Sequence, residues 1–147
     1  MEKLKLYLDN CCFNRPFDDQ QHPLVKIETE AKLLIQDELL AGKINLVWSY
    51  ILFQENNDNP YPNRKQQVLT WESLASQHIT RTEDIEAYAE SLLPMGFKAK
   101  DALHVACAVA AGADYFITTD KKVLNKSVPG ITTMNPIDFV RRHFYED

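Results

Sequence analysis

The sequence predicts an α/β protein, a three-layer α/β/α sandwich with a central, mainly parallel sheet. Short apolar segments with strand character recur along the chain, and segments with helical spacing separate them. With 147 residues, 45% of them hydrophobic, the chain is long and apolar enough to bury a core. We therefore expect residues 1–147 to form a single domain.

Each expected strand is a short apolar run, and these runs are residues 4–8, 44–48, 78–80, 115–118 and 131–134. The clearest long helix is expected over residues 24–40. Apolar residues recur there with helical spacing, and Gly42 stands where a C-terminal cap belongs. Further helices are expected over residues 50–53, 64–75, 98–111 and 136–144, and another is expected to begin after residue 82.

Three of these helices carry a start signal in the sequence. Ser49 and Thr82 are residue types that accept a hydrogen bond from the first turn of a helix, and Glu83 and Asp84 suit the positive end of the helix dipole. Asn135 followed by Pro136 is typical of a cap and the first helical position. These signals predict where the helices begin.

The glycine and cysteine residues exclude several classes of protein. The four glycines are isolated, so the chain has neither of the glycine-rich loops that cradle nucleotide phosphates. The three cysteines form no C-x-x-C pair, so no disulfide framework or zinc site is indicated. Free thiols favour a cytoplasmic location. The uncharged stretch 102–113 is too short to cross a bilayer, so we expect no membrane partner.

The net charge of −5 disfavours a protein that holds nucleic acid by bulk positive charge. The positions of the acidic residues are more informative than their number. Asp9 and Asp120 follow expected strands, Glu55 lies in or after the helix that Ser49 begins, and Asp101 opens the most apolar helix. In open parallel sheets, ligands bind beyond the carboxyl ends of the strands, so these four side chains are expected to converge there.

Taken singly, each of the four acids has an ordinary structural explanation. Asp9 can start a turn, Asp101 can stabilise a helix dipole, Glu55 can be a solvated helix residue, and Asp120 can belong to a solvated loop. Gathered together, carboxylates repel one another unless a cation neutralises them. Oxygen ligands suit Mg²⁺ or Mn²⁺, and such cations promote phosphodiester hydrolysis. The combination therefore indicates metal-assisted hydrolysis of a phosphodiester.

The chain resembles PIN domains, the small nuclease fold typified by the toxins of VapBC toxin–antitoxin pairs. The motifs that carry the resemblance are L-Y-L-D-N at residues 6–10, Glu55 after Ser49, D-A-L-H at residues 101–104, and Y-F-I-T-T-D at residues 115–120. The final Asn135 and Pro136 before a helix also fit. The resemblance covers nearly the whole chain and implies a PIN-like fold.

The resemblance implies a catalytic and metal-binding role for Asp9, Glu55, Asp101 and Asp120. Asn10 stands where the family often has Ser or Thr, and its amide is expected to hydrogen-bond water beside the metal. Thr118 matches the threonine of the family's T-x-D motif and is expected to orient Asp120. The expected phosphate contacts are Lys98, Lys100, Lys121 and Lys122, with Lys126 as a further candidate.

Two neighbouring features have competing interpretations. His104 lies one turn after Asp101 and could face the site, but its apolar neighbours favour a core histidine. Residues 14–19 could form a rim beside Asp9, but Pro16 and Asp18 favour an ordinary turn.

The resemblance implies an endoribonuclease that uses Mg²⁺ or Mn²⁺, acts on RNA, forms a homodimer and has an antitoxin partner. A catalytically inactive PIN domain that binds RNA or a protein is the main alternative. A phosphoaspartyl enzyme is disfavoured, because such phosphatases need Asp-x-Asp after the first strand and here Asn10 and Cys11 follow Asp9.

Overall fold

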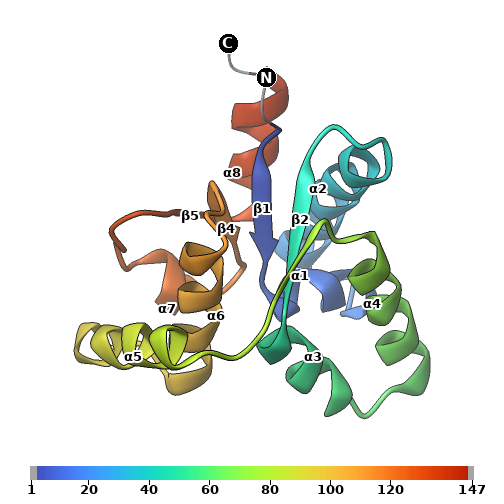
Figure 1. The fold of residues 1–147 in the computed structure, drawn as a ribbon. Coiled ribbons are helices and arrows are strands. Elements are labelled where there is room, and N and C mark those ends of the chain that lie inside the picture. The colour runs from blue at the N-terminus through green and yellow to red at the C-terminus, as the bar shows by residue number, and fades with distance from the viewer. Residues whose placement is uncertain (1–2, 146–147) are drawn as a thin grey trace.

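The computed structural model describes residues 3–145 and places five parallel strands in one sheet (Figure 1). The sheet order is β3-β2-β1-β4-β5. Neighbouring strands pair in parallel register, for example Tyr7 with Val47 on one side and Phe116 on the other. The strands are β1 (Lys5–Leu8), β2 (Asn45–Ser49), β3 (Gln77–Ile79), β4 (Tyr115–Ile117) and β5 (Thr132–Met134).

The helices cover the two faces of this sheet and complete the predicted three-layer α/β/α fold. One group is formed by α2 with α8, and another by α5 with α6, which α3 also contacts. The α-helices are α1 (Asn10–Asn14), α2 (Pro23–Leu40), α3 (Tyr50–Asn57), α4 (Pro62–Leu74), α5 (Glu83–Leu92), α6 (Ala99–Ala110), α7 (Lys121–Leu124) and α8 (Pro136–Val140). Shorter 3₁₀ turns are η1 (Arg15–Phe17) and η2 (Leu93–Met95), and the π-helical segment η3 (Arg141–Tyr145) follows α8.

The strand order places a topological switch between β1 and β4. The chain first runs outward from β1 through β2 to β3, and then returns to the other side of β1 to add β4 and β5. Loops on the two sides of a switch point diverge, which leaves an opening at the carboxyl ends of the strands. The residues that follow β1 and β4 therefore flank this opening.

The predicted helix starts are confirmed by their capping hydrogen bonds. The Ser49 side chain accepts from the backbone N–H of Leu52, and the Thr82 side chain accepts from that of Ile85. Asn135 caps α8 in the same way through Asp138. Local sequence signals thus decided these boundaries correctly.

Two short helices beside the site were not predicted. α1 and η1 occupy the segment after β1, and α7 occupies the segment after β4. The caps of α1 and α7 are Asp9 and Asp120, whose side chains accept from the backbone N–H groups of Asn10 and Lys122. These helices are too short to show an apolar period, so periodicity could not reveal them.

The apolar spacing in residues 24–40 predicted a helix correctly but marks its buried face only in part, through Ala31 and Ile35. Leu24, Ile27 and Leu34 are 41%, 49% and 41% exposed, whereas Glu28 and Lys32 are buried. Arg15 forms an ion pair with Glu28, and aromatic rings surround the Lys32 ammonium. These contacts allow two charged side chains to occupy the inner face of α2.

The core is centred on β1 and β4. Tyr7 and Phe116 are fully buried, and their rings stack with centroids 5.3 Å apart. Among the residues described, no helix is both long and apolar enough to cross a membrane.

Candidate functional site

Asp9 is held rigidly at the switch point. Its backbone N–H donates to the carbonyl of Ile117, which continues the pairing of β1 with β4 by one residue. The residue is buried, with 7% of its surface exposed, and its Oδ1 accepts a hydrogen bond from the Asn10 N–H at 2.8 Å. Because the hydrogen bond uses only one lone pair of that oxygen, the carboxylate retains acceptor capacity.

Thr118 connects Asp9 to Asp120. Its hydroxyl donates to Asp9 Oδ2 at 2.9 Å and accepts from the Asp120 backbone N–H at 3.1 Å. The sequence predicted that Thr118 orients Asp120, and the structure shows that it contacts Asp9 as well. Thr118 is fully buried, so this hydroxyl fixes the spacing of two acidic residues that are far apart in sequence.

Asp101 lies in the first turn of α6, close to the other acids. Gly96, at φ 98°, ends η2 just before α6 begins; that left-handed conformation suits glycine. Burial raises the pKa of Asp101, and the charges of Asp9 and Asp120 raise it further. Repulsion of this kind requires proximity, so three carboxylates from separate elements share one electrostatic environment.

Glu55 reaches the same region from α3. Burial acts to raise the pKa of its carboxyl group, but the hydrogen bond from His104, the charge of that imidazole and the neighbours named next together outweigh burial, so the net pKa is lowered. The positive charge of Lys100 and a hydrogen bond from the Asn10 side chain act in the same direction. Glu55 therefore stays ionised and is tied to its neighbours.

His104 is a core histidine, as its apolar neighbours favoured, and it also contacts two acids of the candidate site. It is fully buried, as expected, but its Nε2 hydrogen-bonds Glu55 and lies 3.8 Å from Asp9 Oδ1. Burial lowers its pKa, yet the hydrogen bond with Glu55 and the negative charges nearby outweigh that effect and raise it. The spacing of three residues after Asp101 was the available signal, because it places both on adjacent turns of one face.

Sequence reasoning missed two further members of this network, Tyr7 and Ser49. The Tyr7 hydroxyl lies 2.6 Å from His104 Nδ1 and 2.6 Å from Ser49 Oγ. A buried hydrogen-bonded chain thus runs from Ser49 at the end of β2, through Tyr7 on β1 and His104 on α6, to Glu55 on α3. No sequence motif indicated Tyr7, because an aromatic residue in a strand is ordinarily core.

The donor chemistry of the site suits a hard divalent cation. All four acids offer carboxylate oxygens, and Asn10 Oδ1 beside Glu55 is buried without a hydrogen-bond partner in the described part of the chain. Within residues 3–144, however, no three His, Cys, Asp or Glu side chains already form a group that could hold a metal ion. The residue types therefore fit Mg²⁺ or Mn²⁺, but in this structure the carboxylates are not gathered closely enough to form a complete coordination sphere.

The predicted phosphate contacts are exposed lysines on both sides of the acids. Lys98 and Lys100 lie at the start of α6, and Lys121 and Lys122 lie on α7. Lys126 is engaged elsewhere, since its ammonium donates to the Lys122 carbonyl and lies 5.3 Å from the Phe97 ring centroid. The positive charge of Lys100 acts to lower the pKa of Glu55, one of the four acids.

The segment 14–19 forms a turn braced against α2 and α4. Arg15 pairs with Asp18 and Glu28, and Arg64 donates to the Phe17 carbonyl at 2.9 Å. These internal partners agree with the interpretation of the segment as an ordinary turn.

The fold and site define a three-layer α/β/α protein with acidic residues at the switch point of its sheet. No protein-family model and no curated protein matches the chain. Among solved structures, it is similar to a chain in the crystal structure of VapBC2 from Rickettsia felis bound to a DNA fragment from their promoter. The TM-score is 0.61 and the identity 17%, over 90% of this chain and 98% of that chain. The likeness is one of fold, and it confirms the predicted PIN-like architecture.

Proposed function

We propose that this protein is a metal-dependent endoribonuclease that hydrolyses RNA phosphodiester bonds with Mg²⁺ or Mn²⁺. The observation that carries the proposal is the placement of Asp9 and Asp120 at the carboxyl ends of β1 and β4, with Asp101 in the first turn of α6. Burial raises the pKa of Asp101, and the charges of Asp9 and Asp120 raise it further. Such mutual repulsion is unfavourable, and it is typical of functional sites where a cation or substrate offsets it.

In this proposal Asp9, Glu55, Asp101 and Asp120 hold the cation. When bound, the cation supplies Lewis-acid polarisation of the phosphodiester and activation of water. Because the carboxylates repel one another, they are expected to draw together only around a cation. Asn10 Oδ1 offers a further oxygen to the cation or to its water.

The hydrogen-bonded chain through His104 keeps Glu55 in place. Hydrogen bonds from His104 on α6 and from the Asn10 side chain on α1 orient the Glu55 carboxylate. Thr118 performs the same task for Asp9. The chain's own residues thus orient the acceptor oxygens that a cation would need.

Substrate binding is assigned in this proposal to Lys98, Lys100, Lys121 and Lys122. All four are exposed and flank the acids on α6 and α7. With a net charge of −5, the protein does not hold RNA by bulk positive charge, so binding should be weak, dependent on the cation and sensitive to salt.

We further propose that the protein is a homodimeric, cytoplasmic toxin with an antitoxin partner. The structural likeness to a VapBC2 complex supports the partner, and the three free cysteines favour a reducing compartment. A catalytically inactive module that binds RNA or a protein is the competing function. Retention of four mutually repelling acids favours the enzyme.

RNA cleavage tests the activity directly. Purified protein is incubated with structured RNA and Mn²⁺ or Mg²⁺, beside Asp9→Asn and Asp101→Asn variants. The control is Asp37→Asn, which removes an exposed carboxylate of α2. We expect cleavage by the wild type and the control only. Equal cleavage by all four proteins would indicate a contaminating nuclease, and no cleavage by the wild type would favour the inactive module.

The partner is tested separately. If a small reading frame beside this gene encodes a DNA-binding protein, co-expression should yield a stable complex that suppresses cleavage. A stand-alone nuclease would cleave RNA but form no such complex.

A further inference from the structure

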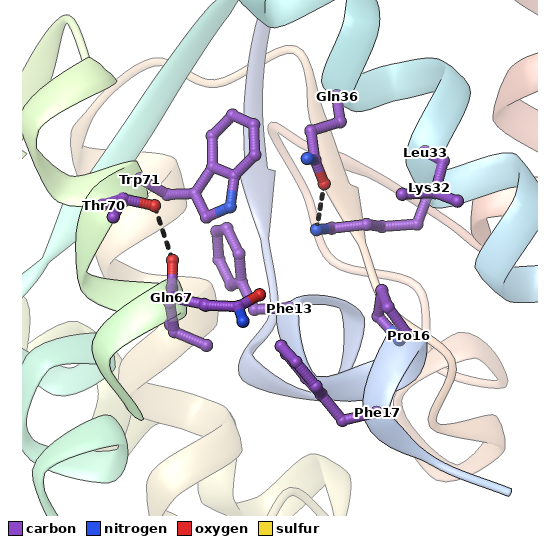
Figure 2. A pocket seen from close by; sticks show the side chains of 10 residues that line it. Phe13, Pro16, Phe17, Lys32, Leu33, Gln36, Gln67, Thr70 and Trp71 are labelled. Carbon is purple, nitrogen blue, oxygen red and sulfur yellow. Dashed lines mark hydrogen bonds between the residues drawn. The ribbon is translucent and has the colours of Figure 1, made fainter. Parts of the chain in front are cut away.

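A cavity lies between α2, α4 and the α1–η1 segment, outside the candidate site formed by the four acids. Its volume is about 210 Å³. None of the four proposed catalytic acids lines it. Figure 2 shows its walls, with Phe13 and Phe17 from the α1–η1 segment, Trp71 and Gln67 from α4, and Lys32 and Gln36 from α2.

The unusual feature of this cavity is the Lys32 side chain, which points into it. Lys32 is only 4% exposed, and Gln36 Oε1 is the one hydrogen-bond acceptor of its ammonium among the described residues (Figure 2). The ammonium lies 5.2 Å from the Trp71 ring centroid and 5.7 Å from that of Phe13. Aromatic faces attract a cation, but they compensate its lost hydration only in part.

No carboxylate of the described residues lies within ion-pair distance of Lys32. Glu28, one turn earlier on α2, is instead paired with Arg15 at 2.9 Å. Burial lowers the pKa of Lys32 to about 8, so the group still carries its charge at neutral pH. Buried ammonium groups are ordinarily paired or neutral, because an unpaired buried charge costs several kcal/mol as an order of magnitude.

The N–H groups of the Lys32 ammonium and the side chains that line the cavity determine which kind of ligand would fit. An ammonium has three donors, and Gln36 accepts one of them. A carboxylate would supply acceptors for the others and cancel the charge. The remaining walls are mostly apolar, so the body that bears the carboxylate should be flat and apolar in order to pack on Phe13, Phe17 and Trp71.

We propose that the cavity is a binding site for a small aromatic carboxylate, with Lys32 as its counter-ion. The volume is below the range of about 300 Å³ and more that is typical of pockets for larger ligands, which suits a single ring. A phosphate is disfavoured, because a dianion would face one cation. An RNA strand is disfavoured because its charged backbone would have to enter a half-enclosed aromatic cavity.

Calorimetric titration with phenylacetate tests the proposal, and phenylacetamide is its neutral analogue of the same shape. We expect phenylacetate to bind the wild type and phenylacetamide to bind at least about tenfold more weakly, since the ion pair is lost. The indole N–H resonance of Trp71 should shift on addition of phenylacetate. N-acetylphenylalanine distinguishes the source of the carboxylate, because tighter binding of this compound would indicate the terminus of a peptide in place of a free acid.

The critical variant is Lys32→Met, which keeps the unbranched aliphatic shape of the side chain, one atom shorter, and removes the buried charge. Such replacements are ordinarily tolerated by the fold, and a melting curve verifies that the variant is folded. Lys26→Met, at an exposed lysine of the same helix, is the matched control. We expect a loss of about tenfold or more in phenylacetate affinity for Lys32→Met and no change for Lys26→Met. Equal affinity for acid and amide, equal affinity in Lys32→Met, or no binding up to about 10 mM phenylacetate would overturn the proposal.

Discussion

His104 donates a hydrogen bond from Nε2 to Glu55, a residue 49 positions earlier in the chain. The opposite ring nitrogen, Nδ1, contacts the Tyr7 hydroxyl, which continues to Ser49. This single imidazole therefore links the buried core to the acidic edge of the sheet. It fixes Glu55 on α3 relative to Asp9 on the neighbouring strand end.

Replacing His104 by Phe should destabilise the protein. The change leaves the Glu55 carboxylate and the Tyr7 hydroxyl without their partner, which should lower the free energy of unfolding by about 1–3 kcal/mol. Urea denaturation measures this loss. Tyr7→Phe, which removes only the hydroxyl, should cost less, about 0.5–1.5 kcal/mol. If His104→Phe were as stable as the wild type, the hydrogen-bonded network would not contribute to the stability of the fold.

Thr118→Val tests the link between Asp9 and Asp120. Valine preserves the shape but removes the hydroxyl, so Asp9 Oδ2 loses a donor and the Asp120 N–H loses an acceptor. We expect a loss of about 1–2 kcal/mol in unfolding free energy and reduced RNA cleavage. Thr119→Val, one residue further along, is the control. The interpretation fails if the two variants behave alike.

Asp101→Asn should stabilise the protein in the absence of divalent cations. The pKa of Asp101 is raised, so the folded state binds its proton more tightly than the unfolded state does. The wild type therefore loses stability as the pH rises from the ordinary pKa of Asp through the raised pKa of the folded state.

The asparagine variant lacks this ionisation and should melt about 1–3 °C higher at pH 7. A melting curve in EDTA measures the difference. At pH 3, where the wild-type carboxyl group is protonated, the advantage should shrink, and an advantage that persists unchanged would contradict the electrostatic explanation.

Mn²⁺ should make the wild type melt at a higher temperature than Asp101→Asn, the reverse of the order expected in EDTA. A cation that binds only the folded wild type stabilises it by mass action, by about 2.7 kcal/mol at a hundredfold excess over Kd. The melting temperature of the wild type should rise on titration with Mn²⁺, while those of Asp9→Asn and Asp101→Asn should rise far less. This readout does not depend on RNA cleavage, so it separates loss of metal binding from loss of catalysis. An equal rise in all three proteins would exclude these acids as ligands.

Because Lys32 is buried, we expect the stability of the protein to change with pH in the alkaline range. Its pKa falls from 10.5 to about 8 on folding, so between these values the unfolded chain binds more protons than the folded one. Stability then increases with pH across that window, by on the order of 3 kcal/mol at most.

Measuring the wild type relative to Lys32→Met removes the contributions of other groups. Between pH 7 and pH 10, the free energy of unfolding of the wild type should increase relative to that of Lys32→Met. A constant difference between the two proteins would mean that Lys32 titrates as an ordinary lysine.

Local sequence determined much of the fold. The five strands and the caps at Ser49, Thr82 and Asn135 were predicted, because each depends on residues that are close in the chain. The alternation of strands and helices in turn predicted the parallel sheet and its three layers. The candidate acids could be named for the same reason, since residues that follow parallel strands share one edge.

Tertiary structure alone decided which side chains meet. The sheet order brings Thr118 onto Asp9, and the packing of α6 against α3 brings His104 onto Glu55. The burial of Lys32 was also invisible in the sequence, because a lysine between apolar residues is ordinarily solvated. The spacing of apolar residues predicts which helix or strand a residue belongs to. Partners far away in the chain, such as the aromatic rings around Lys32, appear only when the chain has folded.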